Sequence, residues 1–439
     1  MSLSSEQYKR ESEALQIFLG EIGDLLEVEN GFVCRKSKLG GKELVQIMSL
    51  GSLENGRASL GDFVQVASDL GLEISCSGFH QRLSMEAVDL LRQVCQLWMQ
   101  QSQANALREV LKPFGAVRIF DSSQIRLAPQ LLETFRGTRN GAALKVQLAY
   151  EYLSGRIEAL EVEAACVPDQ NCDLPQNLSR AGDLAIFDLG YFDQERFAEL
   201  AAKGSYFLSR LQNQVALYRE QADQSALDIL AELKTLPSTL QMGEQRVYLG
   251  QKCKVPVRLI YYRLNPELVA ERRRKAKLGA KKRGKKLQEK TLDWLDWAFF
   301  ITNAPTECLN LEQVAIVYRV RWQIELLFKV WKQEMDWDFM ANWRVERVLV
   351  QFYGRCLALL IFHRLVEKYQ AEWDWELCWQ KAFRLFKRRC AKLIQIVHAN
   401  FWGILTFLRD LDQRFRRFAR KTKRRKDPST YSLLQLAGA

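Results

Sequence analysis

Two apolar stretches in the middle of the chain each end at an aspartate, and this pattern restricts the fold more than any other feature. In VRIFDSS the alternation places Val117 and Asp121 on the same face of an extended strand. In DLAIFDLGYF an unbroken apolar run, typical of a fully buried strand, ends at Asp188. A carboxylate beside buried apolar residues is unfavourable unless a cation compensates its charge. The sequence therefore predicts a sheet with two carboxylates at or near strand ends, where metal ions would resolve the conflict.

The surrounding segments supply further strands and helices. Two alternating stretches, residues 144–152 and 156–164, flank a Ser-Gly turn and predict a β-hairpin. Periodicity predicts the other elements as strands over 204–211 and in WAFFITN, a helix over 193–202, one long helix over 311–335, and amphipathic helices over 346–420. Strands and helices mixed in this order indicate an α/β protein.

Residues 211–297 interrupt this pattern and are expected to form a β-rich insertion. Short β-like pieces such as RVYLG and CKVPVRLIYYRL lie there within a polar, irregular segment. Residues 271–290 hold eleven Lys or Arg against two Glu, which is too much charge for a core and predicts a mobile basic loop. The stretch GAKKRGKK ends in Lys286 instead of Ser or Thr and follows no apolar strand, so it is not a nucleotide-binding loop.

The first hundred or so residues are expected to form a helical domain. The stretch over about 58–84 predicts a helix before Gly71 and a second helix after a short turn, as in helix-turn-helix domains that bind DNA. A simple packing hairpin of two helices fits the same pattern. The predicted divisions are an N-terminal helical DNA-binding domain (1–110), a core in two parts (111–210 and 298–345) separated by the insertion (211–297), and a C-terminal helical region (346–439) whose tail at 414–426 is basic.

Charge and composition narrow the class of partner. Lys and Arg number 64 against 52 Asp and Glu, a formal net charge of +12, which favours a polyanion, with nucleic acid preferred over an anionic membrane surface. The apolar runs are far shorter than the roughly 20 residues of a membrane span, and the N-terminus lacks an apolar signal core. We therefore expect a cytoplasmic protein with no membrane partner. The ten cysteines and three histidines show no zinc-site spacing.

The segment YRVRWQIELLFKVWK places four polar residues along one face of a helix. At 100° per residue they fall at about 0°, −60°, −20° and −40° around the axis: Tyr318, Arg321, Glu325 and Lys332. A salt-bridged surface helix would also explain Glu and Lys on one face. Two carboxylates on strands and a third on a following helix, however, form the arrangement that holds paired Mg²⁺ ions roughly 3.5–4 Å apart for phosphodiester attack.

These residues resemble the insertion-sequence-four family of DDE transposases. The last catalytic block of that family is tyrosine, two residues, arginine, three residues, glutamate, six residues and lysine, which is the spacing found here. IFDSS, GTRNGAALKVQ, and DLGYF followed by YFLSRL resemble the preceding blocks in the same order. The resemblance covers about residues 110–345. It implies a ribonuclease H-like mixed-sheet core interrupted by a β-rich insertion and flanked by N-terminal and C-terminal α-helical domains.

The resemblance also implies roles for individual residues. Three acids would be catalytic and would bind two Mg²⁺ ions, for which Mn²⁺ can substitute: Asp121, Asp188 and Glu325. Three side chains of one helix would contact DNA phosphates near the cleaved end: Tyr318, Arg321 and Lys332.

Four tryptophans carry two interpretations. Trp294 and Trp297 are candidates to stack on a DNA base flipped out near the transposon end, as in hairpin-forming relatives, although core packing is the preferred interpretation for each. Trp322 and Trp331, on the same helix as Glu325, are expected to anchor in the core.

The predicted function is that of a transposase which binds the terminal inverted repeats of an insertion sequence, cleaves DNA at its ends and joins them to target DNA. Its partners would be double-stranded DNA and a second copy of the chain, as a homodimer in the synaptic complex. Two alternatives stay open, a catalytically inactive DNA-binding protein derived from a transposase and a non-mobile metal-dependent nuclease. Intact acids argue against the first, and the helical and inserted segments argue for specific DNA ends.

Overall fold

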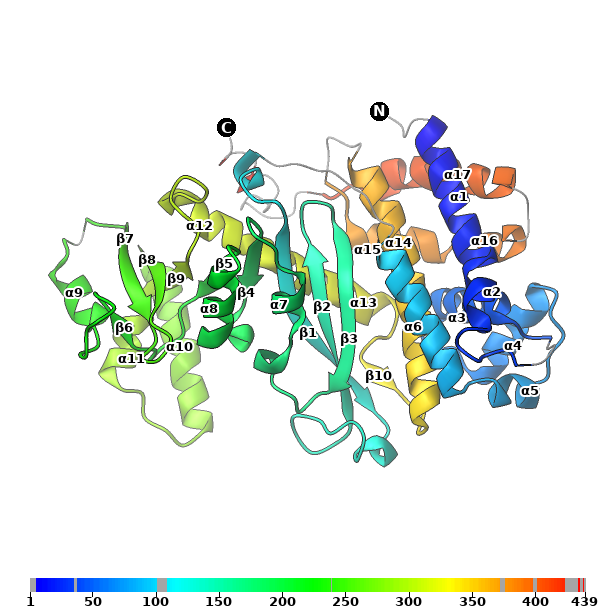
Figure 1. The fold of residues 1–439 in the computed structure, drawn as a ribbon, viewed down its shortest axis with the longest axis horizontal. Coiled ribbons are helices and arrows are strands. Elements are labelled where there is room, and N and C mark those ends of the chain that lie inside the picture. The colour runs from blue at the N-terminus through cyan, green and yellow to red at the C-terminus, as the bar shows by residue number, and fades with distance from the viewer. Residues whose placement is uncertain are drawn as a thin grey trace. The chain divides into compact units, whose positions relative to one another are not determined.

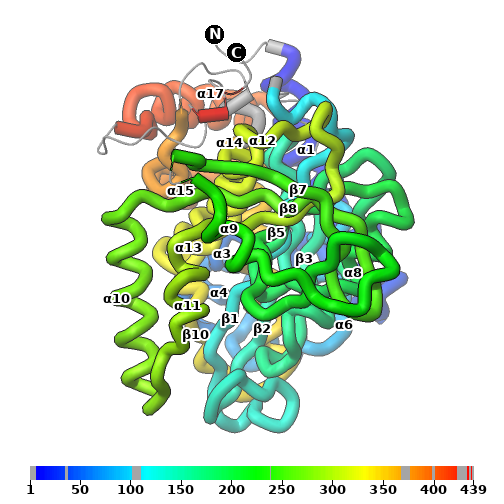
Figure 2. Tube along the Cα trace, turned by 90° about the vertical axis from the view of Figure 1, so that its left-hand side faces the viewer, coloured from blue at the N-terminus to red at the C-terminus, as the bar shows by residue number. Residues whose placement is uncertain are grey.

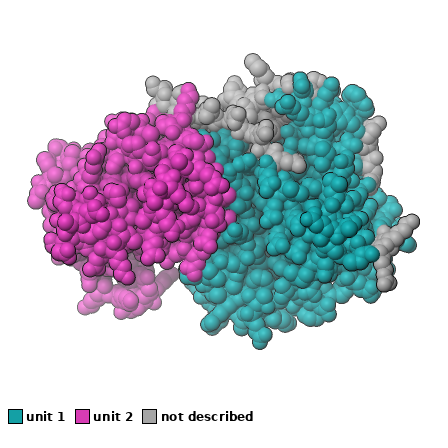
Figure 3. Space-filling model, viewed as in Figure 1, with its two compact units in different colours: residues 1–106, 122–168, 323–428 teal, residues 107–121, 169–322, 429–439 magenta. Residues whose placement is uncertain are grey.

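The computed structural model of the chain divides into two compact units. It describes residues 5–34, 38–100, 109–237, 239–371, 376–397 and 401–422, together with residues 433, 434 and 437. Unit 1 comprises residues 1–106, 122–168 and 323–428, and unit 2 comprises residues 107–121, 169–322 and 429–439 (Figure 3). Each unit is therefore assembled from segments that lie far apart in the sequence.

Unit 1 is built largely from helices, with α14 (Val345–Ala371) packed against α3 (Gly41–Glu54) and α6 (Met85–Gln100). α14 and α3 lie close together at Gly354, where a Cβ atom would lie 2.8 Å from the carbonyl oxygen of Met48. Further helices of unit 1, which confirm the predicted helical segments, are α1 (Ser5–Gly20), α2 (Ile22–Glu27), α4 (Leu60–Asp69), α5 (Cys76–Gln81), α13 (Trp322–Glu334), α15 (Trp379–Lys387), α16 (Cys390–Ile396) and α17 (Phe401–Phe418) (Figure 1).

The strands of unit 1 follow the order β3-β2-β1. β2 (Ala143–Glu151) and β3 (Arg156–Ala164) pair antiparallel, with Val146 opposite Val162, which confirms the predicted hairpin. β1 (Val117–Leu127) is longer than expected and contributes residues 117–121 to unit 2 and residues 122–127 to unit 1. β10 (Phe339–Met340) pairs in parallel with the end of β1.

The strands of unit 2 follow the order β1-β4-β5-β9-β8-β7-β6. β4 and β5 run parallel to β1, whereas β9, β8, β7 and β6 pair antiparallel with their neighbours, so the sheet is mixed, as predicted. The strand bounds are β4 (Leu184–Phe187), β5 (Tyr206–Arg210), β6 (Leu217–Tyr218), β7 (Met242–Leu249), β8 (Val255–Arg263) and β9 (Trp297–Thr302). Helices of this unit include α7 (Leu174–Leu178), α8 (Gln194–Ala202), α9 (Ile229–Thr235) and α12 (Leu311–Tyr318).

The predicted insertion forms strands, but its basic segment is not a loop. β8 pairs with β9, so the insertion extends the sheet of unit 2. α10 (Pro266–Lys282) and α11 (Glu289–Trp294) occupy most of the expected loop over residues 271–290, so that prediction is wrong (Figure 2). Lys, Arg, Ala and Leu are strong helix formers, and an exposed helix needs no apolar core. The side chain of Asn265 caps α10 by accepting from the backbone N–H of Leu268 at 2.8 Å.

The predicted helix-turn-helix segment contains α4 and α5, joined by a turn in which Gly71 has a φ of +79°. The Oγ atom of Ser75 accepts from the backbone N–H of Gly78 at 3.1 Å and caps α5. The Arg82 side chain donates to the carbonyl oxygen of Phe32 at 2.5 Å, so it is held within unit 1. Both the DNA-binding and the simple packing interpretation of this pair fit these contacts.

The predicted long helix over residues 311–335 is interrupted. α12 ends at Tyr318, a 3₁₀ turn covers Arg319–Arg321, and α13 begins at Trp322. The C-terminal helix α17 ends at Phe418, and residues 423–426 of the basic tail lie outside the described residues. Within the described parts of the chain, every helix is too short or too polar to cross a membrane.

Candidate active site

The two predicted aspartates lie at equivalent positions on neighbouring strands of unit 2. In the parallel pair β1 and β4, Val117 lies opposite Leu184 and Ile119 lies opposite Ile186, an offset of 67 residues. The same offset separates Asp121 from Asp188, so extending the register by two residues places them side by side. Neighbouring strands are about 4.8 Å apart, and residues in register point to the same face. Both aspartates are half-buried.

The carboxylate of Asp188 is fixed by the turn that follows β4. β4 ends at Phe187, and the Oδ1 atom of Asp188 accepts hydrogen bonds from the backbone N–H groups of Gly190 at 2.8 Å and Tyr191 at 3.3 Å. A Cβ atom on Gly190 would lie 3.1 Å from this Oδ1 and 3.3 Å from Oδ2 of Asp169. Asp169, which the sequence did not point to, thus brings a third carboxylate to this turn.

Tyr191, in the turn that follows Asp188, is almost fully buried. Burial raises the pKa of its hydroxyl well above the usual value, and Cys172, Asp169, Asp121 and Asp188 raise it further. The hydroxyl therefore keeps its proton at neutral pH and stays a hydrogen-bond donor near the carboxylates.

Tyr318 lies within reach of the charge of Asp188, and the Arg321 guanidinium lies 6.0 Å from the Tyr318 ring centroid. The Tyr318 ring packs edge-on against Phe300 of β9, with ring centroids 5.0 Å apart. Burial raises the pKa of Tyr318 to about 12; the charges of Arg321 and Arg210 lower it, Asp188 raises it, and a side-chain hydrogen bond with Arg321 lowers it. The structure therefore brings Tyr318 into the neighbourhood of Asp188 and places Arg321 beside Tyr318.

Arg210 completes this neighbourhood, and sequence reasoning missed it. In the parallel pair β4 and β5, Leu184 lies opposite Tyr206 and Phe187 lies opposite Ser209, so the next residues in register are Asp188 and Arg210. On its other side, Arg210 pairs with Phe300. A cation thus stands beside the aspartates in the same row of the sheet. Its position in YFLSRL, directly after the buried residues of β5 as Asp188 follows those of β4, was the available signal.

Glu325 and Lys332 belong to unit 1, on α13. Glu325 is half-buried in the first turn of α13, and Lys332 is exposed in its last turn. Trp331, on the same helix, is buried, and its Nε1–H donates to Nε2 of His363 at 3.1 Å, which confirms that it anchors the core. Trp322 is 53% exposed, so the prediction that it is a core residue is wrong. It lies at the junction of the 3₁₀ turn and α13, where the periodicity of one long helix no longer applies.

The two tryptophans proposed to stack on a base are both packed within unit 2. Trp297 is 6% exposed, with Tyr261 edge-on at 5.8 Å and the Arg263 guanidinium 4.4 Å from its ring centroid. Trp294 is half-buried, with its ring centroid 4.2 Å from that of Phe299. These contacts are those of the core-packing interpretation.

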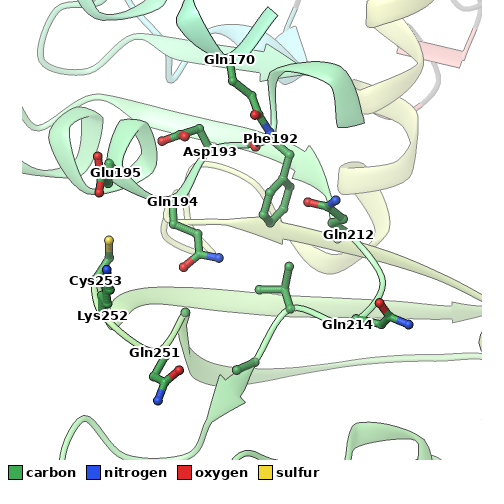
Figure 4. A pocket seen from close by; sticks show the side chains of 13 residues that line it. Gln170, Phe192, Asp193, Gln194, Glu195, Gln212, Gln214, Gln251, Lys252 and Cys253 are labelled. Atoms are coloured by element: carbon green, nitrogen blue, oxygen red, sulfur yellow. Dashed lines mark hydrogen bonds between the residues drawn. The ribbon is translucent and has the colours of Figure 1, made fainter. Parts of the chain in front are cut away.

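A pocket of about 580 Å³ adjoins the turn after Asp188 (Figure 4). Phe192 lines it, and its other walls carry five primary amides, whose donors and acceptors project from several elements: Gln170, Gln194, Gln212, Gln214 and Gln251. Asp193 also lines it, but its Oδ1 caps α8 by accepting from the backbone N–H of Arg196 at 2.8 Å. Glu195 and Lys252 line the pocket too, so it combines these neutral hydrogen-bonding groups with two carboxylates and one ammonium group.

Hard divalent cations prefer carboxylate oxygens, and the neighbouring Asp121 and Asp188 supply them. Across the described residues, no cluster of three or more His, Cys, Asp or Glu side chains is arranged to hold a metal ion. The structure therefore shows a pair of aspartates in unit 2 whose chemistry fits such a cation. Glu325 belongs to unit 1.

The chain belongs to the family described as Transposase DDE domain, which it matches over residues 112–361, more than half its length. The family match and the similarity to named insertion-sequence transposases over most of the chain support the function of an insertion-sequence transposase. The chain is 28% identical over 392 residues to the transposase of element IS231F of Bacillus thuringiensis subsp. israelensis, covering 82% of this chain and 81% of that one. It is 27% identical over 450 residues to the IS231B transposase of subsp. berliner (95% and 92% covered).

A further relative is the transposase of element IS1151 of Clostridium perfringens, 27% identical over 365 residues, with 77% of each chain covered. These relatives confirm the resemblance to the insertion-sequence-four family. Among solved structures, the cryo-EM piggyBac transposase synaptic complex with hairpin DNA has a TM-score of 0.47 and 9% identity, over 95% of this chain and 87% of that one.

Proposed function

We propose that this transposase binds the terminal inverted repeats of its insertion sequence, cleaves the DNA at the element's ends and joins those ends to target DNA. The observation that carries the proposal is the pair Asp121 and Asp188, at register-equivalent positions of two parallel strands. Two carboxylates held this close are disfavoured by mutual repulsion, and a bound cation relieves it.

The metal site would comprise Asp121, Asp188 and Glu325. Two Mg²⁺ ions, for which Mn²⁺ can substitute, would supply activation of water for cleavage and then of the freed 3′-hydroxyl for strand transfer. The chain's own contribution is orientation. The N–H groups of Gly190 and of the buried Tyr191 fix one oxygen of Asp188.

The cationic and hydroxyl groups beside the acids would hold the DNA phosphates. The protonated hydroxyl of Tyr318 can donate to a phosphate oxygen, and the guanidinium groups of Arg210 and Arg321 near it carry positive charge. Lys332, exposed on α13, would add a further contact along the same DNA. Trp294 and Trp297 would take part in stacking on a flipped base only after leaving their present packing.

The wider architecture supports the same proposal. The mixed sheet, in which parallel strands carry the acids and an antiparallel hairpin adjoins β1, suits a ribonuclease H-like core, with residues 111–210 and 298–345 as its two parts. Residues 211–297 would be its insertion, residues 1–110 would bind the repeats, and residues 346–439 would form the C-terminal helical region. A homodimer would hold two element ends together in the synaptic complex.

The experiment that tests this proposal compares two labelled duplexes in Mg²⁺. One ends in the inverted repeat that flanks the gene, and the other has the same base composition in shuffled order. Cleavage confined to the repeat boundary supports the proposal. Cleavage of both duplexes alike would favour a general nuclease, and binding to the repeat without any cleavage would favour an inactive DNA-binding protein.

A further inference from the structure

The outward face of α10 is an exposed basic surface. From residue 272 to residue 287 the sequence contains no acid. At 100° per residue, five exposed cations cover an arc of about 160° on one side of the helix: Arg274, Lys275, Lys277, Lys281 and Lys282. Only Lys275 of these has an ion-pair partner among the described salt bridges, Glu271 at 2.6 Å. Figure 2 shows α10 as one long continuous helix.

Charges of one sign on one helix face destabilise the isolated helix, by about 0.2–0.5 kcal/mol for each pair at i and i+4 such as Lys277 and Lys281. A helix that only needed solubility would intersperse acids, as the surfaces of soluble domains generally do. The bias toward one sign therefore indicates a polyanionic partner.

The opposite face of α10 is fixed to the sheet of unit 2. The guanidinium of Arg272 donates to the carbonyl oxygens of Leu295 at 3.3 Å and Trp297 at 3.0 Å. Arg273 forms a bidentate pair with Asp296, at 3.0 and 2.8 Å. The outward cations thus lie on a helix that is fixed to the sheet, so less conformational freedom is lost when they bind.

The contacts that hold α10 are made at the start of β9, in the sheet that carries the aspartates. Arg272 donates to the carbonyl oxygen of Trp297, the first residue of β9, and Arg210 pairs with Phe300 of the same strand. Arg210 stands beside Asp188 in the parallel register. The first turns of α10 therefore begin next to the candidate active site, and its basic face extends away from it.

We propose that the outward face of α10 binds the phosphate backbone of duplex DNA beside the active site, through contacts that do not depend on sequence. The proposal rests on the proposed function and extends it to a second DNA contact. DNA carries one charge per about 1.7 Å of its axis, and Arg274 to Lys281 span about 10 Å of helix, so several phosphates can be engaged at once.

The test measures how binding of the full-length protein to DNA weakens with salt, by fluorescence anisotropy. The DNA is the repeat-end duplex and, in parallel, the shuffled duplex. The variants are Lys281→Gln/Lys282→Gln and the charge-preserving Lys281→Arg/Lys282→Arg. The control is Lys112→Gln/Lys203→Gln, which removes two exposed cations of unit 2 from the opposite, amino-terminal edge of the parallel strands.

The expected result is a shallower plot of log K against log salt for Lys281→Gln/Lys282→Gln, by about 0.9 per lost contact and therefore about 1.8 in all. Over a fourfold rise in salt, its affinity would fall about 12-fold less than that of the wild type. The arginine variant and the control would keep the wild-type slope, and both duplexes would respond alike. An unchanged slope, or an equal change in the control, would overturn the proposal.

Failure here and failure of the proposed function are distinguishable. If the α10 variant keeps the wild-type salt slope while the wild type still cuts at the repeat boundary, only the α10 contact is wrong. If the slope changes as expected although the repeat boundary is never cut, the DNA-binding face stands and the catalytic proposal falls.

Discussion

The hydroxyl of Tyr318 gives the sharpest single-atom prediction. Replacing Tyr318 with Phe keeps the ring that packs 5.0 Å from Phe300 and removes only the donor near Asp188 and Arg321. A hydrogen bond to a charged group such as phosphate contributes about 1.5–3 kcal/mol. Because each 1.36 kcal/mol is tenfold in rate, single-turnover cleavage of the repeat duplex should slow by about 10- to 150-fold.

Tyr262 provides a matched control for this variant. It also packs edge-on against Phe300, at 5.7 Å, and burial likewise raises its pKa to about 12, but its hydroxyl donates to the carbonyl oxygen of Leu311. Tyr262→Phe should lower the free energy of unfolding by about 1–3 kcal/mol, by leaving that carbonyl without its donor, and should keep the cleavage rate. Tyr318→Phe should keep the free energy of unfolding and slow cleavage.

The reasoning fails if Tyr318→Phe cleaves at the wild-type rate, or if its loss of rate only follows a loss of folded protein in urea denaturation. A pH series adds a second check. With a pKa of about 12, Tyr318 keeps its proton beyond the usual value of 10, so the wild type should show no tyrosine titration in its cleavage rate up to pH 10.

Three further predictions concern other parts of the molecule. Arg210→Gln, which removes the cation beside the aspartates, should slow single-turnover cleavage at least tenfold, with Arg210→Lys in between, whereas equal rates would remove Arg210 from the site. Burial lowers the pKa of His363 from 6.5 to about 3, so its contribution to stability is complete above pH 6.5 and is lost as the pH falls toward 3. Urea denaturation should show a free energy of unfolding about 2 kcal/mol lower at pH 5 than at pH 7, and this difference should be absent in His363→Gln. Gly354→Ala should destabilise unit 1 by about 1–3 kcal/mol in the same assay, because its Cβ would meet the α3 backbone at 2.8 Å, and an unchanged midpoint would show that the helices separate freely.

The sequence predicted the strands that carry the acids because the local pattern alone determines them. Val117, Ile119 and Phe120 and the apolar run Leu184 to Phe187 are each followed by Asp, and these apolar residues are buried in strands of the structure. Their pairing in register could not be read from either run, since a register depends on which strands become neighbours. Arg210 was missed for the same reason, because only the pairing of β4 with β5 places it beside Asp188.

The incorrect predictions arose where charge was given more weight than helix propensity and anchoring. Residues 271–282 were expected in a loop because no core could hold so many cations, yet α10 keeps most of them in solvent and holds Arg272 and Arg273 against β9 and its preceding turn. Trp322 was expected in the core because the helix was taken as continuous, whereas the 3₁₀ turn before α13 leaves it exposed.

The DNA roles of the tryptophans stay predictions. Trp297 and Trp294 pack in unit 2, and their contacts neither need nor prevent a later rearrangement on DNA. The role of Glu325 as a metal ligand and that of Lys332 as a phosphate contact likewise stay predictions.

The most direct test of the central claim is cleavage of the repeat-end duplex in Mg²⁺ by Asp188→Asn beside Asp193→Asn. Both wild-type side chains accept backbone hydrogen bonds at the start of a helical turn, and asparagine preserves that acceptor in each. Only Asp188 lies in register with Asp121. We predict that Asp188→Asn binds the duplex as the wild type does but does not cut it, while Asp193→Asn cuts normally. Cleavage by Asp188→Asn at the wild-type rate would contradict the assignment of this aspartate pair as the catalytic centre.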